Sequence, residues 1–557
     1  MTMVSRLSMQ TVVFLAVYLS STCARYHDFP QKPILKFADI TDDFKPRDAA
    51  ENTASYWQSQ SMAALQRHLE TSLRTGPAKN VILFLGDGMS IATVTAARIY
   101  LGQLNNQSGE EYQLSFEQFP FTGLSKTYCV DSQVADSACS GTAYLTGVKN
   151  NIQTLGVTAD VTSKDWRAMQ NPAFHTHSII EWAQEAGKGT GIVTTCKVTD
   201  ASPAAGYAHS AYRYWQNDQD ILKDVPGAKG VQDIASQLIE NNPGKGIKVI
   251  LGGGRGNFIP QENQDEYSNN GLRGDGKDLI KVWKSQKEVA NVSTSYITNR
   301  DQLLDLDVNT TDYLLGLFHH GHMDYHLHAD SSLQPTLAEM TTLAIKMMQK
   351  EENGYFLFIE GGRIDHGHHE NRAHLALDET VEFDKAIEIA LNMTSQEDTL
   401  IVVTADHSHT MTINGYPRRG SDIFTTLMTT MDNLTYSTLS YANGPNNHRF
   451  ELNSHEQHDI STDPREDPDY TFPTIHLLNY ETHDGQDVGV YARGPSAHLL
   501  VGNYEQSLIP HVMGYAARIG PAAAIAPKVE TLLTSSSYSV TPTLILVLFS
   551  VIILVKL

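Results

Sequence analysis

Short apolar runs, each followed closely by an acidic residue, recur at three places along the chain. The runs are Val81–Leu85, Tyr355–Ile359 and Leu400–Val403, and the acids that follow them are Asp87, Glu360 and Asp406. Continuous apolar runs of this length are typical of strands that are buried on both faces of a parallel sheet. We therefore predict three such strands, with the acidic residues at their carboxyl ends.

Segments with helical periodicity alternate with the apolar runs. Apolar residues recur near a 3.6-residue period between Asn52 and Leu73, and a helical pattern follows from Ile91 to Leu101. Two further candidate strands are Gly191–Thr194 and Val249–Leu251. Alternation of strands and helices predicts an α/β fold with a mostly parallel central sheet and helices on both faces.

The pattern changes between about Met411 and Tyr480. This segment is rich in Asn, Pro, Asp, Tyr and His, and it shows no long helical period. We predict that residues 411–480 form an inserted subdomain that packs on the main domain. The main domain then comprises residues 52–410 and 481–525.

The first 24 residues have the layout of a secretory signal peptide. Arg6 precedes an apolar run from Thr11 to Leu19, and small residues end at Ala24. Five N-x-Ser/Thr sequons support the same secretory route. They are at Asn106, Asn291, Asn309, Asn392 and Asn433.

The other end, residues 535–557, has the layout of a glycosylphosphatidylinositol (GPI) attachment signal. Small polar residues and a short spacer precede the 12-residue apolar tail Leu544–Val555. This tail is shorter than the roughly 20 residues that span a bilayer. A tilted membrane helix that starts near Val540 is the alternative. In both cases we expect the chain to end on a membrane, at the extracellular face of the cell.

Charge and cysteine content exclude some classes of protein. The chain has 557 residues and a formal net charge of −22, so it lacks the basic surface of a nucleic-acid-binding protein. An enzyme that acts on phosphate is not excluded, because bound cations can reverse the local sign of an acidic site. After Cys23 leaves with the signal peptide, Cys129, Cys139 and Cys196 remain. They permit at most one intrachain disulfide, and their spacing does not show which.

The acids at the predicted strand ends suggest a metal centre. Carboxyl ends of parallel strands meet at one edge of a sheet, where carboxylates repel one another unless cations lie between them. A single acid after a strand is usually a helix N-cap, which is the alternative for each of the three. Three acids, each beside Gly or His, favour metal binding.

Histidines strengthen this interpretation. Asp365 and His369 are four residues apart, which places them on one face of a helical turn. Asp406 and His407 form a second pair, His483 is a further candidate, and carboxylate and imidazole are ligands that zinc accepts. We interpret five other histidines as part of a surface loop. They are His319, His320, His322, His326 and His328.

Ser137 opens a helix-like segment and is the candidate nucleophile. A serine at this position lies near the positive end of the helix dipole and near free backbone N–H groups, which suits a phosphoryl group. Taken alone, Ser137 is equally compatible with a plain helix N-cap. No histidine base with an orienting acid is evident beside it in the sequence, so a metal would have to activate the hydroxyl.

Taken together, these segments resemble the animal membrane-anchored alkaline phosphatases, plausibly an insect one. Asp136–Thr142 resembles the active-site signature of the family, and the resemblance runs in order from about Asn52 to Gly520. Other blocks resemble the metal-binding and phosphate-positioning segments of the family. They are Phe84–Met89, Asp200–Ala204 with Tyr207, His209 and Arg213, Glu360–Glu370, Thr404–His409 and Glu481–His483.

The resemblance implies two Zn²⁺ and one Mg²⁺ per subunit. The first zinc would be held by Asp365, His369 and His483, and the second by Asp87, Asp406 and His407. Asp87 would also contact the magnesium, together with Ser202 and Glu360, and with Asp200 either directly or through water. Arg213 would grip two phosphate oxygens through its planar guanidinium.

The implied activity is hydrolysis of phosphate monoesters at alkaline pH, through a phosphoserine on Ser137 and with broad specificity. The family also implies an alkaline phosphatase-like fold with a crown-like subdomain, and a homodimer. Vertebrate relatives carry histidine at the position of Asp200, and His319 and Gln334 stand where acidic calcium ligands would be expected. Glu266 is the one such ligand that matches, so calcium is not expected.

Two other functions stay open from the residues alone. A phosphodiesterase or sulfatase of the same superfamily would use threonine or a modified residue in place of Ser137. A surface receptor or adhesion protein on an inactive scaffold would have lost ligands, and every matched metal position is kept here.

Overall fold

The computed structural model describes residues 48–428, 435–446 and 459–525. The predicted signal peptide (1–24), the predicted attachment signal (535–557) and the sequon at Asn433 lie outside these residues. Within the described residues, no helix is both long and apolar enough to cross a membrane.

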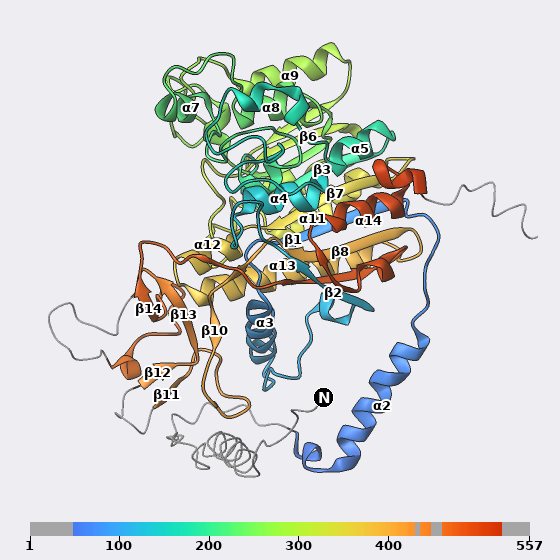
Figure 1. The fold of residues 1–557 in the computed structure, drawn as a ribbon, viewed down its shortest axis with the longest axis vertical. Helices are drawn as coiled ribbons and strands as arrows, with labels where there is room; N and C mark the ends of the chain where they lie inside the picture. Colours follow the sequence, from blue (N-terminus) through green and yellow to red (C-terminus); the bar gives the residue numbers. More distant parts are fainter. Residues whose placement is uncertain (1–47, 429–434, 447–458, 526–557) are drawn as a thin grey trace, which may run out of the picture.

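A ten-stranded sheet forms the centre of the molecule (Figure 1). Its strands are β1 (Asn80–Gly86), β2 (Phe121–Lys126), β3 (Gly189–Lys197), β4 (Val249–Gly253), β5 (Thr294–Ile297), β6 (Tyr313–Leu317), β7 (Tyr355–Gly361), β8 (Thr399–Ala405), β16 (Val488–Arg493) and β17 (Gly502–Glu505). They lie in the order β17-β2-β16-β8-β1-β7-β3-β4-β6-β5. Neighbours pair in parallel except for β16, which is antiparallel to β2 and β8. The predicted mostly parallel sheet is confirmed.

Helices cover both faces of this sheet, as predicted. They are α3 (Ile91–Leu104), α4 (Ser137–Thr146), α5 (Ile179–Glu185), α6 (Ala201–Ala204), α7 (Asp218–Asp224), α8 (Ile234–Glu240), α9 (Leu279–Val289), α10 (Arg300–Leu304), α11 (Leu337–Met348), α12 (Arg363–His369), α13 (Ala373–Met393) and α14 (Leu508–Ala517). On β1, Ile82 and Phe84 pack toward α3, α11 and α13, whereas Leu83 and Leu85 pack toward α4, α5 and α14. Because successive side chains alternate between faces, a strand buried on both sides reads as a continuous apolar run.

The three strands that end in acidic residues lie side by side in register. Gly86 of β1 pairs with Gly361 of β7 and with Ala405 of β8. Asp87 and Asp406 directly follow their strands, and Glu360 precedes Gly361. All three acids therefore lie at one edge of the sheet, where parallel strands present their carboxyl ends.

The segment 411–480 differs from the rest of the molecule. Its described residues form small sheets from β10 (Thr412–Ile413), β11 (Thr426–Met428), β12 (Thr435–Ser437), β13 (Leu439–Gly444) and β14 (Thr474–Leu477). On either side of it, β9 (Ser408–His409) pairs with β15 (His483–Asp484). This pairing brings the two ends of the segment together, and it places His409 beside His483.

Near the amino-terminal end, helix α2 (Ala54–Glu70) stands away from the body of the molecule (Figure 1). The sequence predicts this helix, but none of its residues is buried. Trp57, Met62 and Leu69 are 51%, 62% and 72% exposed. Apart from Trp57, whose indole N–H donates to the Glu51 carbonyl at 2.8 Å, its apolar stripe is largely exposed.

Candidate functional site

Ser137 is the first residue of α4 and points into the edge where the acids gather. Asp136 is the N-cap, and its carboxylate accepts a hydrogen bond from the Cys139 N–H at 3.2 Å. Because Asp136 caps the helix, the Ser137 hydroxyl does not have to accept the capping hydrogen bond. The hydroxyl is buried, and its Oγ lies 3.2 Å from His407 Nε2. The alternative that Ser137 is a plain cap is therefore wrong.

His407 belongs to a first group of potential metal ligands. Its Nε2 lies 3.6 Å from Asp87 Oδ1 and 3.1 Å from Asp406 Oδ2. The Gly88 N–H donates to Asp406 Oδ1 at 2.9 Å. Gly88 has a φ of +67°, and a Cβ there would come within 2.5 Å of the His409 ring. Glycine is therefore required where the chain turns out of β1.

A second group consists of Asp365, His369 and His483. The Nδ1–H of His369 donates to the Glu481 carbonyl at 2.6 Å, and the Nδ1–H of His483 donates to the Ala135 carbonyl at 2.7 Å. The Nε2 atoms of the two rings lie only 3.1 Å apart, and both face Asp365. A cation shared by the two nitrogens, either a proton or a metal ion, would satisfy this contact.

The spacing of the second group fits zinc. Asp365 lies 3.3 Å from His369 Nε2 and 3.4 Å from His483 Nε2. Ligands about 2.0–2.1 Å from a tetrahedral zinc lie roughly 3.3 Å from one another. A tetrahedral zinc held by these three side chains would keep one position open, as catalytic zinc sites do.

Glu360, Ser202 and Asp200 lie beside the first group, on β7 and at the start of α6. Thr194 Oγ1 donates to Glu360 Oε2 at 2.5 Å. The Ser202 hydroxyl and Asp87 Oδ1 are buried and have no hydrogen-bond partner within the described protein. These two orphaned oxygens, together with the Glu360 carboxylate, suit a hard cation such as Mg²⁺.

Electrostatics at this edge favour bound cations. Burial, and then the carboxylates of Asp406, Asp365 and Glu360, raise the pKa of Asp87 well above its ordinary value. Burial raises the pKa of Glu360 to about 8, and burial together with Asp365 raises the pKa of Asp406. A divalent cation would remove the mutual repulsion that raises these pKa values.

Arg213 reaches the same edge from the loop after α6. It donates to Asp136 Oδ2 at 3.2 Å and to Asp200 Oδ1 at 3.3 Å. Burial opposes its charge, but these two carboxylates hold the pKa of Arg213 well above its ordinary value. Its guanidinium therefore stays charged beside Ser137, with a fork geometry that suits phosphate oxygens.

The structure also assigns neighbours that the sequence analysis missed. His409 is fully buried, and it bridges Asp365, at 2.6 Å, and the Glu481 carboxylate. Burial lowers its pKa, but Glu481 and Asp365 together raise the pKa of His409 to about 10. His409 lies in the block Thr404–His409 that resembles the family, but the sequence did not show which residues it contacts.

The structure changes the interpretation of His322 and shows which cysteines pair. His322 is not a plain surface histidine, because its Nε2 lies 3.6 Å from Asp200 Oδ2. The loop is folded back onto the sheet there, since the Met323 N–H donates to the Thr195 carbonyl of β3 at 3.1 Å. Cys129 and Cys139 form the single disulfide of the described residues, and Cys196 is a buried free thiol.

Comparison with known proteins gives the same family across most of the chain. The alkaline phosphatase family profile matches residues 78–519. The membrane-bound alkaline phosphatase of Bombyx mori is 46% identical over 499 residues, which cover 88% of this chain and 90% of that protein. The tissue-nonspecific alkaline phosphatase of Rattus norvegicus is 45% identical, and the match covers 86% of this chain and 91% of that protein.

Solved structures show the same fold. A histidine-to-aspartate mutant of the TAB5 alkaline phosphatase, with Mg bound in its M3 site, has a TM-score of 0.56 at 23% identity and covers 81% of this chain and 100% of that chain. The Thermus thermophilus alkaline phosphatase has a TM-score of 0.56 at 20% identity, with 80% and 94% covered. The chain therefore belongs to the alkaline phosphatase family, and it is an enzyme that hydrolyses phosphate monoesters.

Proposed function

We propose that Ser137 is the nucleophile and carries the phosphoryl group between the two halves of the reaction. The observation that carries this proposal is the position of its Oγ, 3.2 Å from His407 Nε2 at the amino end of α4.

The ligand groups support three metal positions. We assign one zinc to Asp365, His369 and His483, and a second zinc to Asp87, Asp406 and His407. We assign magnesium to Asp87, Ser202 and Glu360, with Asp200 beside this set. When bound, the ions supply positive charge that lowers the pKa of bound hydroxyl groups and stabilises the attacking and leaving oxygens.

Residues of this chain take part in each step of the reaction. Ser137 Oγ gives its proton to a hydroxide ion from solvent and attacks phosphorus in line, the ester P–O bond breaks, and the departing alkoxide takes a proton from water. Arg213 holds two phosphoryl oxygens, and the N–H groups at the start of α4 face the same negative charge. Water then attacks phosphorus from the vacated side, and the bond between Oγ and phosphorus breaks to release phosphate.

Replacement of the nucleophile tests this assignment. We expect Ser137→Ala to abolish turnover of a phosphomonoester and to leave no acid-stable label after incubation with radioactive phosphate. Thr146→Val on the same helix is the matched control, because its hydroxyl bonds to the Thr142 carbonyl at 2.7 Å and lies away from the ligand groups. Near-normal hydrolysis by Ser137→Ala would overturn the proposal.

Elemental analysis tests the metal assignment. We expect at least two zinc ions and one magnesium ion per chain in active protein, and no calcium. Gln334 supports the absence of calcium, because its amide donates to Asp324 at 2.6 Å where an acidic ligand would be needed. Active protein with a single zinc per chain would require a different mechanism.

We further propose that the mature enzyme is a glycosylated homodimer, GPI-anchored at the extracellular face of the cell membrane. The sequons, the apolar tail and the name of the membrane-bound Bombyx mori relative support the anchor. The exposed stripe of α2 supports a partner subunit. Phosphatidylinositol-specific phospholipase C should release activity from intact cells, and Met62→Glu with Leu69→Glu should shift sedimentation toward monomer.

The domain division belongs to the same proposal. We propose residues 52–410 and 481–525 as the catalytic domain and residues 411–480 as a crown-like subdomain. The antiparallel pair β9 and β15 supports this division, because it closes the segment at its base. A chain in which a short linker replaces residues 411–480 should still bind zinc if the division is right.

A further inference from the structure

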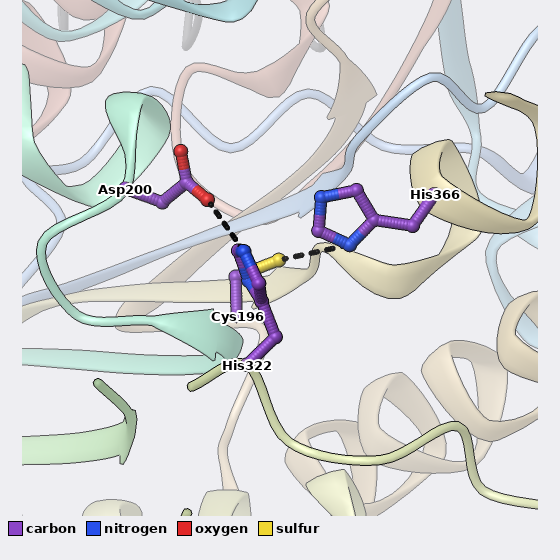
Figure 2. A group of neighbouring side chains, drawn as sticks. All are labelled: Cys196, Asp200, His322 and His366. Carbon is purple, nitrogen blue, oxygen red and sulfur yellow. Dashed lines mark hydrogen bonds and ion pairs between the residues drawn. The ribbon is translucent and has the colours of Figure 1, made fainter. Parts of the chain in front are cut away.

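A further set of potential metal ligands combines Asp200 with three residues to which the catalytic assignment gives no role. Cys196 is on β3, Asp200 precedes α6, His322 is in the loop after β6, and His366 is on α12. Figure 2 shows the four side chains converging on one another. One ligand atom of each lies within 4.8 Å of the others.

The distances between these atoms are those of ligands around an ion. Cys196 Sγ lies 3.9 Å from His366 Nδ1, and His322 Nε2 lies 3.6 Å from Asp200 Oδ2 (Figure 2). Both contacts are long for a hydrogen bond. Around a tetrahedral zinc, a thiolate and an imidazole nitrogen lie roughly 3.6 Å apart, and an imidazole nitrogen and a carboxylate oxygen roughly 3.3 Å apart. For these two pairs, closure on an ion needs shifts of a few tenths of an ångström.

The local backbone holds the thiol in place. Cys196 is buried, and it is the free cysteine of the described chain. Its N–H donates to Thr194 Oγ1 at 2.8 Å. A Cβ on Gly362 would come within 2.5 Å of Cys196 Sγ, so the turn between β7 and α12 leaves room for the sulfur only because residue 362 is glycine.

We propose that Cys196, Asp200, His322 and His366 form a fourth metal site, which takes a thiophilic divalent ion, with Zn²⁺ as the fitting ion. The thiolate and carboxylate neutralise the ion, and the two imidazoles bind as neutral ligands. Only oxygen and nitrogen ligands make up the three catalytic positions, so the sulfur of Cys196 distinguishes this site chemically, although Asp200 also lies beside the magnesium set.

Binding has a defined competitor. Arg363 Nη1 donates to His366 Nδ1 at 2.7 Å, and the Lys197 N–H donates to His322 Nδ1 at 3.3 Å. Zinc must displace the guanidinium from His366 or use the other nitrogen of that ring, and the His322 ring must give up its bond from Lys197 and carry its proton on Nδ1 so that Nε2 can bind. The Arg363 guanidinium already lies 3.8 Å from the centre of the Tyr325 ring, so it keeps a cation–π partner when it leaves His366.

Cobalt substitution tests this site separately from the catalytic ones. The full-length enzyme is stripped with a chelator and titrated with Co²⁺ while the near-ultraviolet spectrum is recorded. A thiolate bound to cobalt gives a charge-transfer band that oxygen and nitrogen ligands do not give. Cys129 and Cys139 are joined in a disulfide, so the band reports Cys196.

We expect the band in the wild-type enzyme and its loss in Cys196→Ser and in His322→Gln, with one cobalt fewer per chain. His328→Gln on the same loop is the control and should keep the band. Absence of the band in fully loaded wild type, or its persistence in His322→Gln, overturns the proposal. If Cys196→Ser does not fold, His322→Gln alone tests the proposal.

Phosphatase activity with zinc and magnesium is measured on the same samples. The band depends on the fourth site alone, whereas turnover depends on Ser137 and the three catalytic positions. Wild-type enzyme that shows the band but no turnover with zinc and magnesium would therefore count against the catalytic assignment. Loss of the band in wild type with turnover retained would count against the fourth site.

Discussion

His409 offers the sharpest test of how the zinc ligands are held. This buried histidine joins Asp365, which we assign to a zinc, to the carboxylate of Glu481. His409→Gln keeps an amide of similar length but can place a donor on only one of the two acids. The other acid then stays buried without its partner.

The structure sets the size of the effect. A hydrogen bond to a charged group contributes about 1.5–3 kcal/mol, and breaking a buried ion pair costs about 3–5 kcal/mol. Glu481 Oε1 keeps its bonds from the Thr410 N–H at 2.7 Å and hydroxyl at 2.5 Å, so the loss is confined to Oε2 and to Asp365. We therefore expect the free energy of unfolding to fall by about 3 kcal/mol, and zinc affinity to fall about 10–100-fold.

Two measurements check this prediction. Competition with a chelator gives zinc affinity, and guanidinium unfolding gives stability for the same protein. His177→Gln is the control, because the His177 side chain is 71% exposed and pairs only with Glu181. If His409→Gln holds zinc as tightly as wild type and unfolds at the same midpoint, the bridge does not orient Asp365 and the reasoning fails.

Three further predictions concern other parts of the chain. Arg213→Lys should weaken inhibition by phosphate about 10-fold or more, because the bidentate fork is lost, and a dose–response curve measures it. Burial lowers the pKa of Lys287 to about 8. Between pH 8 and its unfolded pKa near 10.5 the unfolded chain binds more protons, so stability should rise with pH, by about 1–2 kcal/mol after solvent screening. Lys287→Met should abolish that rise in urea unfolding at several pH values, and the exposed Lys281→Met should not. Replacing Cys129 and Cys139 with alanine should destabilise the enzyme by about 2–3 kcal/mol, as thermal unfolding would show, and reduction should then have no further effect.

Local spacing was enough to predict part of the site. Asp365 and His369 lie on one turn of α12, and the acids at the ends of β1 and β8 follow from apolar runs that any central parallel strand requires. These features depend on residues a few positions apart. Periodicity and turn chemistry are therefore enough to predict these features.

Contacts between distant segments could not be predicted from the pattern. His409 depends on Glu481, 72 residues away, and only the pairing of β9 with β15 brings the two together. His322 looked like one of several loop histidines, because nothing in its own segment shows that the loop folds back on β3. The edge strand β17 and its neighbour β2 are partly exposed, so they lack the apolar run that marked the centre of the sheet.

The wide separation of the proposed zinc ligands along the chain has a consequence for biogenesis. The proposed zinc ligands run from Asp87, at the end of β1, to His483, in the strand that closes the inserted segment. Contacts of such long sequence separation form only after most of the chain is available. A ribosome-bound chain that ends before His483 therefore lacks one of the three ligands of the zinc that we assign to Asp365, His369 and His483. Metal loading, and with it activity, must follow synthesis of nearly the whole catalytic domain, so zinc supply matters in the compartment where folding finishes.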